Sequence, residues 1–301
     1  MFGIQERNQI MRRFLKLDRE SRTAYLFLSP ILVFFFIFYF LPIGMAFYQG
    51  LYSGMFGKSV FVGLKNYARI FNDEVVLTSL RSTLYFMVIS GSVIFLISLG
   101  LAIILNENIR ARTTFRSILF FPYMISLVII GYAWSFILDQ RNGILNYFLS
   151  FVGIPNIEWF SPELALLSIV IMFAWWLIGY CAMLFTAGMQ SIPGEYYEAC
   201  RLDGASTLDC LRFITIPLLR PIMMFVILMI ILFSFQTFVL IFNTTGGGPS
   251  NATNLYIFHL YRVAFLHLNP GYASALTFLG MTIIIGMAII IFKKMDIKFE
   301  Y

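Results

Sequence analysis

Six long apolar segments, separated by shorter polar stretches, organise the chain. Each is long enough to cross a bilayer as a helix, which takes about 20 predominantly apolar residues. The pattern predicts an all-α integral membrane protein with six transmembrane helices. We expect the spans near Tyr25–Tyr48, Leu80–Leu105, Ile118–Leu138, Leu164–Met189, Leu218–Phe242 and Tyr272–Phe292.

The composition supports a membrane protein over a soluble one. Hydrophobic residues make up 60% of the chain, above the roughly 45–50% of a soluble domain, and the mean hydropathy is +0.84. The 34 Phe residues are heavily used, and Tyr and Trp gather near several span ends, as residues at the membrane–water interface do.

The basic residues predict the orientation. Fifteen of the 21 Lys and Arg residues fall at the N-terminus, in the second and fourth connections and at the C-terminus. Because basic loops remain cytoplasmic, we expect both termini and these two connections to face the cytoplasm. The net charge of +6 therefore reflects topology and anionic lipid, and we predict no nucleic-acid partner.

The middles of all six spans lack charged residues and His. Carriers driven by protons usually bury ionisable groups there, although sodium can be held by carbonyl oxygens alone. No nucleotide site is evident either: the "GKS" at Gly57–Ser59 lacks the first glycine of a P-loop, since Tyr52 stands there. The energy for any transport is expected to come from elsewhere, and not from a nucleotide bound to this chain.

One dense polar stretch, "EYYEACRLDGAS" over 195–206, interrupts the apolar pattern. Pro193 closes the fourth span, and Gly194 to Leu202 is predicted to form a short helix. Gly204 can adopt positive φ and turn the chain, and a second helical piece, Ala205 to Phe213, leads back to the membrane. The pattern predicts a two-helix unit on the cytoplasmic face; an interfacial helix lying on lipid is the alternative.

The same residues resemble the cytoplasmic loop of importer-type ABC transporter permeases. That loop has the pattern E-A-A, three residues, G, nine residues, I, one residue, L-P. It matches Glu198-Ala199-Cys200, Gly204, Ile214 and Ile216-Pro217, with Cys200 and Ile216 as departures. "FVGLKNYARIF" at 61–71 and "NTTGGGPSNATNLYIFHLYRVAF" at 243–265 are similar to the carbohydrate-uptake branch, typified by the larger maltose permease subunit.

The resemblance implies a type I ABC importer permease fold. It implies a cytoplasmic tail over 1–23, a six-span permease domain over 24–292 with a coupling loop at 190–217, and a tail over 293–301. In the family, the first helix of this loop docks into an ATPase subunit. Carried over, the docking residues are Glu198, Ala199, Cys200, Asp203, Gly204 and Ala205.

A substrate pathway is expected where polar and aromatic side chains interrupt the apolar spans. Sugar rings stack on aromatic faces while their hydroxyls bind uncharged polar groups, a mixture typical of ligand pockets. In the fifth span Phe233, Ser234 and Thr237 lie close to one helical face. The fourth span adds Trp175 and Tyr180, and Tyr180 matches a family contact position. Packing between helices is the alternative role for all five.

The loop "TTGGGPS" excludes helix and strand and allows close backbone approach. The resemblance suggests that it meets an extracytoplasmic substrate-binding protein or projects toward the pathway, with Gly246, Gly247 and Gly248 at its centre. A plain turn has the same pattern.

The cysteines and histidines predict no catalytic or metal site. The spacing of Cys200 and Cys210 matches no zinc motif, and a cytoplasmic loop is reducing, so we expect structural thiols; Cys181 lies inside the fourth span. His259 and His267 fall in the last outer loop, where we predict surface residues rather than ligands.

We therefore predict a permease subunit, not an enzyme, of a heteromeric ATP-driven importer that moves a sugar or oligosaccharide by alternating access. The partners would be a second homologous permease, two ATPase subunits carrying ATP and Mg, a solute-binding protein and membrane lipid. The location would be a bacterial or archaeal cytoplasmic membrane. The alternatives are a glycerol-phosphate importer, a secondary carrier or channel acting without ATPase subunits, and a scaffold subunit.

Overall fold

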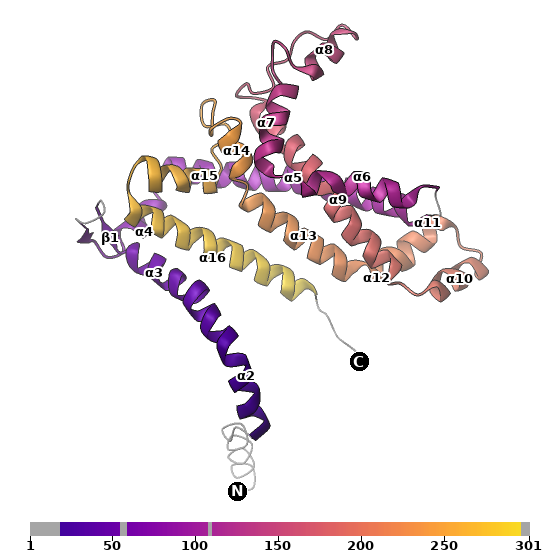
Figure 1. The fold of residues 1–301 in the computed structure, drawn as a ribbon, viewed down its shortest axis with the longest axis horizontal. Helices are drawn as coiled ribbons and strands as arrows, with labels where there is room; N and C mark the ends of the chain where they lie inside the picture. The colour runs from indigo at the N-terminus through magenta and orange to yellow at the C-terminus, as the bar shows by residue number, and fades with distance from the viewer. Residues whose placement is uncertain (1–18, 55–58, 108–109, 296–301) are drawn as a thin grey trace.

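The chain folds into a bundle of helices with one short strand pair (Figure 1). A computed structural model describes residues 19–54, 59–107 and 110–295. Most of the two predicted tails, 1–23 and 293–301, and part of the "GKS" segment lie outside these ranges. The strands β1 (Tyr52–Ser53) and β2 (Val60–Phe61) pair antiparallel. The helices are α2 (Arg19–Phe35), α3 (Leu41–Gln49), α4 (Lys65–Ile70), α5 (Glu74–Asn106), α6 (Arg112–Met124), α7 (Leu127–Ile137), α8 (Ile144–Ser150), α9 (Ala165–Gln190), α10 (Gly194–Leu202), α11 (Thr207–Cys210), α12 (Ile216–Leu218), α13 (Arg220–Phe235), α14 (Val239–Asn243), α15 (Tyr256–Tyr261) and α16 (Pro270–Met295), with π-helical turns at Phe36–Phe40, Leu211–Thr215 and Arg262–Leu266.

Within the described residues, five helical stretches are long and apolar enough to cross a membrane: Thr23–Gln49, Glu74–Asn106, Ala165–Gln190, Arg220–Asn243 and Pro270–Lys294. A sixth candidate is the pair α6 and α7, which meet at a bend of 98°. These six stretches correspond to the six predicted spans. The protein is therefore a helical, multi-pass membrane protein.

The prediction of one continuous third span over Ile118–Leu138 is wrong in its middle. Ile125 is extended, with φ −84° and ψ 138°, and Ser126 then caps α7 by accepting a hydrogen bond from the Val128 N–H at 3.4 Å. Pro122, which has no N–H to donate, stands in the last turn of α6. The bend follows because the chain leaves the helix and starts a new one.

Helix α9 is the centre of the bundle. It packs against α5, α6, α7, α13 and α14, and most of its apolar side chains are buried. The closest approach is at Gly179, where the backbone of α6 at Leu119 lies against the α-carbon. A small residue at such a crossing lets two membrane helices come together.

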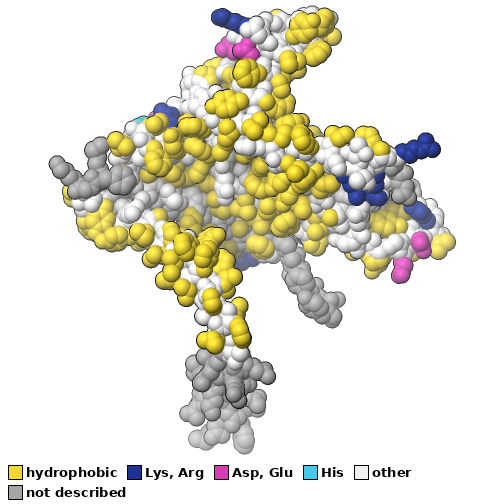
Figure 2. Space-filling view, in the orientation of Figure 1, with side chains coloured by type: hydrophobic (Ala, Val, Ile, Leu, Met, Phe, Trp, Pro, Cys, Tyr) yellow, Lys and Arg dark blue, Asp and Glu magenta, His cyan; other side chains and the backbone are white. Residues whose placement is uncertain are grey.

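The first span, α2 and α3, stands largely apart from this bundle (Figure 1). Its apolar side chains are exposed along its described length, and Figure 2 shows hydrophobic side chains over this part of the surface. Of its described part, α3 packs on the rest of the protein, where Phe47 contacts Phe278 with ring centroids 5.1 Å apart. Lipid or another subunit must cover the remainder.

The connections alternate between two ends of the bundle. We call "the α10 end" the side that holds α10 to α12, and "the α4 end" the side that holds β1, β2, α4 and α15 (Figure 1). Helices α8 and α15 and the break between α13 and α14 were not anticipated.

Substituting Gly179 by Ala tests the packing of α6 on α9. The added Cβ would meet the carbonyl oxygen of Leu119, and such overpacking costs about 1–3 kcal/mol. We expect the thermal unfolding midpoint in detergent to fall. Gly100→Ala in α5 is the matched control, because no described atom lies within 4 Å of its added Cβ; equal midpoints for the two variants would contradict this packing.

Candidate functional site

The loop between α9 and α13 forms a compact unit at the α10 end. Helix α10 begins directly after Pro193, and Gly204, with φ +76°, turns the chain at its end. Ser206 then starts α11 with a capping box: its hydroxyl accepts from the Asp209 N–H at 3.3 Å, and the Asp209 carboxylate accepts from the Ser206 N–H at 3.0 Å. The hydroxyl and backbone N–H of Ser206 lower the pKa of Asp209.

The expected docking residues divide by exposure. Glu198, Ala199, Asp203 and Gly204 are exposed, and Ala205 is half-buried. Cys200 is buried and forms a disulfide with Cys210, whose Cα lies 6.1 Å away. The expectation of unpaired thiols is therefore wrong, because the turn at Gly204 returns α11 onto α10. The side chain of Cys200 faces α11, so it is unavailable to a partner at the surface.

Two apolar side chains next to these residues extend the exposed surface. Leu202 is 88% exposed and Leu208 is 71% exposed, although both belong to the loop unit. The polarity of the surrounding stretch concealed them in the sequence. Exposed apolar side chains rimmed by polar residues are typical of surfaces that bind another protein or a membrane.

Four aromatic side chains meet inside the bundle, and we call them the aromatic cluster: Tyr123 from α6, Trp176 and Tyr180 from α9, and Phe233 from α13. Tyr123 stacks on Tyr180 with centroids 4.4 Å apart and contacts Trp176 at 5.1 Å. Phe233 meets Trp176 edge-on at 5.6 Å and Tyr180 at 6.4 Å. The cluster joins two expected pathway residues, Tyr180 and Phe233, to two that we did not predict, Tyr123 and Trp176.

Ser234 and Thr237 lie deeper than Phe233. Ser234 is fully buried, and its hydroxyl has no hydrogen-bond partner among the described residues. Thr237 is 4% exposed and donates to the carbonyl oxygen of Phe233 at 2.9 Å. Buried polar atoms usually have partners, so the unpaired hydroxyl of Ser234 is an exception inside the bundle. The expected role of Ser234 in the pathway stays a prediction.

Trp175 does not join the aromatic cluster. It is 41% exposed and packs edge-on against Trp134 of α7, with centroids 5.8 Å apart. Adjacent helical residues point about 100° apart, which separates Trp175 from Trp176.

The glycine-rich loop is closely packed on the bundle. Gly246 and Gly247 have φ of +59° and +85°, and a Cβ on Gly247 would meet the ring of Phe258 at 2.5 Å. The hydroxyl of Thr253 donates to the Gly248 carbonyl at 2.9 Å. The close backbone approach expected from this composition is therefore present, at the α4 end.

His259 is buried, so the prediction that it is a surface residue is wrong; His267 is exposed as predicted. His259 sits on the inward face of α15, and both of its ring nitrogens lack partners among the described residues. Burial, with the charges of Arg262 and His267, lowers the pKa of His259, while Asp73 opposes this. No group of His, Cys, Asp or Glu within the described ranges could hold a metal ion.

A bundle of spanning helices with an interior aromatic cluster and a rigid exposed loop defines the class of membrane permeases. The chain belongs to the family of binding-protein-dependent transport system inner membrane components, whose model matches residues 94–294. The resemblance noted from the loop motif is confirmed. The protein is thus a permease subunit of an ABC importer, a transport component and not itself an enzyme.

Two relatives illustrate the similarity. The trehalose/maltose transport system permease protein MalF of Thermococcus litoralis is 30% identical over 91% of this chain and 94% of its own length. The sn-glycerol-3-phosphate transport system permease protein UgpA of Agrobacterium fabrum is 32% identical over 92% and 96%.

Solved structures show the same fold. A bacterial ABC transporter involved in the import of the acidic polysaccharide alginate superposes with a TM-score of 0.80 at 19% identity, over 96% of this chain and 100% of that chain. The same kind of transporter in complex with an alginate pentasaccharide-bound periplasmic protein gives 0.76 at 20% identity, over 91% and 93%.

Thiol counting tests the bond in the loop. The chain has three cysteines, and Cys181 is free and buried. We expect alkylation of the denatured, unreduced protein to modify one cysteine, and alkylation after reduction to modify three, as read from the intact mass. The Cys181→Ser variant should take up no label before reduction. Three labelled cysteines without reduction would show that Cys200 and Cys210 are unpaired.

Proposed function

We propose that the chain is one of two different permeases in an ATP-driven importer of a sugar or oligosaccharide. The observation that carries this proposal is the aromatic cluster, whose members come from three spans and contain no charged side chain. Stacked aromatic rings with uncharged polar tips suit a neutral, hydroxylated solute. The relative named for trehalose/maltose transport supports this choice of substrate class.

The α10 end is proposed to face the cytoplasm. The basic residues of its connections favour that side, and the two basic chain ends are proposed to lie there too. The α4 end, with the glycine-rich loop around Gly246–Gly248, would then meet an extracytoplasmic solute-binding protein. The membrane would be a bacterial or archaeal cytoplasmic membrane.

The exposed side of α10 is proposed to dock on an ATPase subunit. Glu198, Ala199, Asp203 and Gly204 lie on it, with Ala205 at its edge and Leu202 beside it. The capping box and the disulfide make this loop rigid. A displacement of α10 is therefore transmitted to α12 and α13. Two ATPase subunits, which carry ATP and Mg, would drive the two permeases between inward- and outward-facing states.

Glycerol phosphate is the second candidate substrate, since several relatives are named for its transport. A phosphate group in a membrane interior needs positive charge or many donors nearby. The aromatic cluster supplies no positive charge, so a neutral sugar is the better match.

Replacing Tyr123 by Ala tests the aromatic cluster as a sugar platform. The loss of a stacked ring is worth about 0.5–1.5 kcal/mol, so we expect the half-saturation concentration of uptake into proteoliposomes to rise roughly 3- to 10-fold. Tyr85→Ala, on an exposed face of α5, is the matched control and should behave as wild type. Unchanged uptake by Tyr123→Ala would remove the cluster from the pathway.

Coupling is tested at the turn after α10. Valine is strongly disfavoured at the positive φ of Gly204, and Glu198→Arg reverses an exposed charge. Both variants are expected to insert normally but to lose most of the transport-linked ATP hydrolysis of the assembled complex. Gly194→Ala, at an open position in the same helix, should retain it. Normal coupling in both test variants would show that the ATPase docks elsewhere.

A further inference from the structure

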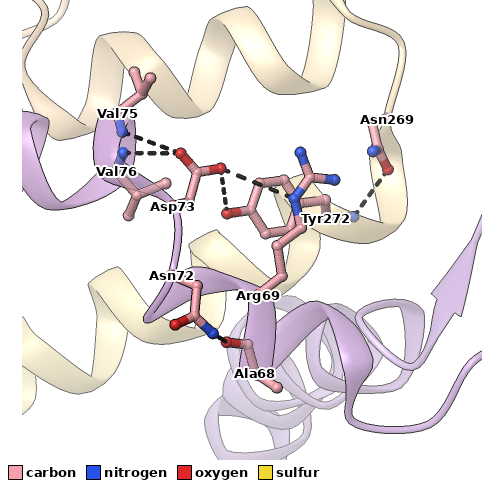
Figure 3. A network of polar contacts seen from close by, with 8 residues as sticks. All are labelled: Ala68, Arg69, Asn72, Asp73, Val75, Val76, Asn269 and Tyr272. Atoms are coloured by element: carbon pink, nitrogen blue, oxygen red, sulfur yellow. Dashed lines mark hydrogen bonds and ion pairs between the residues drawn. The ribbon is translucent and has the colours of Figure 1, made fainter.

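A cavity of about 380 Å³ at the α4 end lies outside the transport machinery described above. It is a partly open cavity lined by α4, the beginning of α5, the loop before α15, α15 with the π turn after it, and the segment that leads into α16. Its polar lining comes from Arg69, Asp73, Asn251, His259, Arg262 and Asn269, among others. Figure 3 shows the side of it formed by Arg69, Asp73 and Tyr272.

The carboxylate of Asp73 is already satisfied by its own chain. One oxygen accepts from the N–H groups of Val75 and Val76, at 3.1 and 3.4 Å, where it caps α5. The other accepts from the Tyr272 hydroxyl at 2.9 Å and lies 3.9 Å from Nε of Arg69 (Figure 3). Burial raises the pKa of Asp73, but these hydrogen bonds and the charge of Arg69 lower it by more, so the net shift is downward. The carboxyl group of Asp73 is therefore an anion at neutral pH.

The cavity holds more hydrogen-bond donors than the Asp73 carboxylate can accept from. The two terminal nitrogens of Arg69 have no hydrogen-bond partner within the described part of the chain, although the guanidinium stacks 4.3 Å over the Tyr272 ring. Arg262 donates to Asn251 at 2.9 Å through one terminal nitrogen. His259, 95% buried, lines the cavity with both ring nitrogens unpartnered among the described residues. Two guanidinium groups against one carboxylate leave a net positive charge, so the cavity complements an anionic group rich in oxygen.

The position of the cavity indicates where that anion comes from. The spanning stretches Glu74–Asn106 and Pro270–Lys294 both begin at its wall, so it lies at the level where the hydrocarbon core ends and the phosphates of the bilayer begin. Two residues close in the chain to those that line it are exposed and apolar: Phe71 is 71% and Phe265 is 66% exposed. A cationic cavity with an apolar rim at this depth matches a lipid headgroup and its chains.

We propose that this cavity binds the phosphate group of an anionic phospholipid, with Arg69 and Arg262 as its two charged contacts and His259 as a further donor. The shared chemistry is a phosphate oxyanion, and a free phosphate ion is the other source. The proposal concerns the α4 end of the spans and holds whichever way the chain crosses the membrane. It is also independent of the transported solute.

The test titrates the purified complex in neutral detergent with dihexanoyl phosphatidylglycerol, dihexanoyl phosphatidylcholine or inorganic phosphate. Bound lipid is counted by native mass spectrometry, and the unfolding midpoint is followed in parallel. We expect phosphatidylglycerol to bind and to raise the midpoint, with at least roughly tenfold higher affinity than phosphatidylcholine. In the Arg69→Gln, Arg262→Gln double variant the affinity should fall on the order of 10- to 100-fold.

Two further variants separate binding from folding. Arg81→Gln removes an exposed arginine of α5 that does not line the cavity, and should bind as wild type. Asn251→Asp keeps an oxygen acceptor for Arg262 but adds a competing negative charge, so it should weaken binding while leaving the unliganded midpoint unchanged.

The titration with inorganic phosphate distinguishes a lipid headgroup from a free phosphate ion. The cavity would be assigned to a free anion if inorganic phosphate saturated it, if this binding were lost in the double variant, and if phosphatidylglycerol bound no more tightly than phosphate. Equal phosphatidylglycerol affinity in wild type and double variant would overturn the proposal. The proposal would also be overturned if neither lipid nor phosphate bound and the double variant associated more weakly with a solute-binding protein. The cavity would then be a contact surface for that protein.

Discussion

A helix inside a bilayer must satisfy its own backbone hydrogen bonds, because hydrocarbon offers no partners. This protein interrupts two of its spanning stretches, between α6 and α7 and between α13 and α14, and both breaks rely on local partners. Ser126 caps the first, and the hydroxyl of Thr237 returns to the Phe233 carbonyl at the second. The pieces beyond the breaks, α7 and α14, pack on each other and on α9, so each bend is supported by the other.

The aromatic cluster lies beside these breaks. Tyr123 comes two residues before the extended Ile125, and Phe233 comes three residues before the end of helical geometry at Gln236. A break is the place where a spanning helix can change direction without a large loss of hydrogen bonding. Uncharged aromatic faces and a place for movement therefore coincide on α9, the buried helix that both broken spans contact.

The loop at the α10 end is rigid for a different reason. Its capping box, the left-handed turn at Gly204 and the bond between Cys200 and Cys210 fix two short helices that could not persist alone in water. Disulfides are uncommon in a reducing cytoplasm, which is the side we propose for this loop. Both sulfur atoms belong to buried residues, and burial limits the access that thiol exchange requires.

The local sequence was sufficient to predict the spans, the short helix after Pro193, the turn at Gly204 and the family. Each of these depends on neighbouring residues: on a run of about 20 apolar side chains, on proline and glycine, or on a motif of fixed spacing. The exposure of Glu198 and Asp203 also follows from polarity alone. The part these residues play in docking stays a prediction.

Tertiary packing decided the rest. Tyr123 meets Tyr180 only because α6 crosses α9 at Gly179, and nothing near either tyrosine encodes that crossing. Cys200 pairs with Cys210 because one turn folds α11 back onto α10. His259 is buried and lines a cationic cavity because α15 lies across the ends of α5 and α16. Contacts between segments far apart in the chain depend on how whole helices pack, and a local pattern of apolar and polar residues does not specify that.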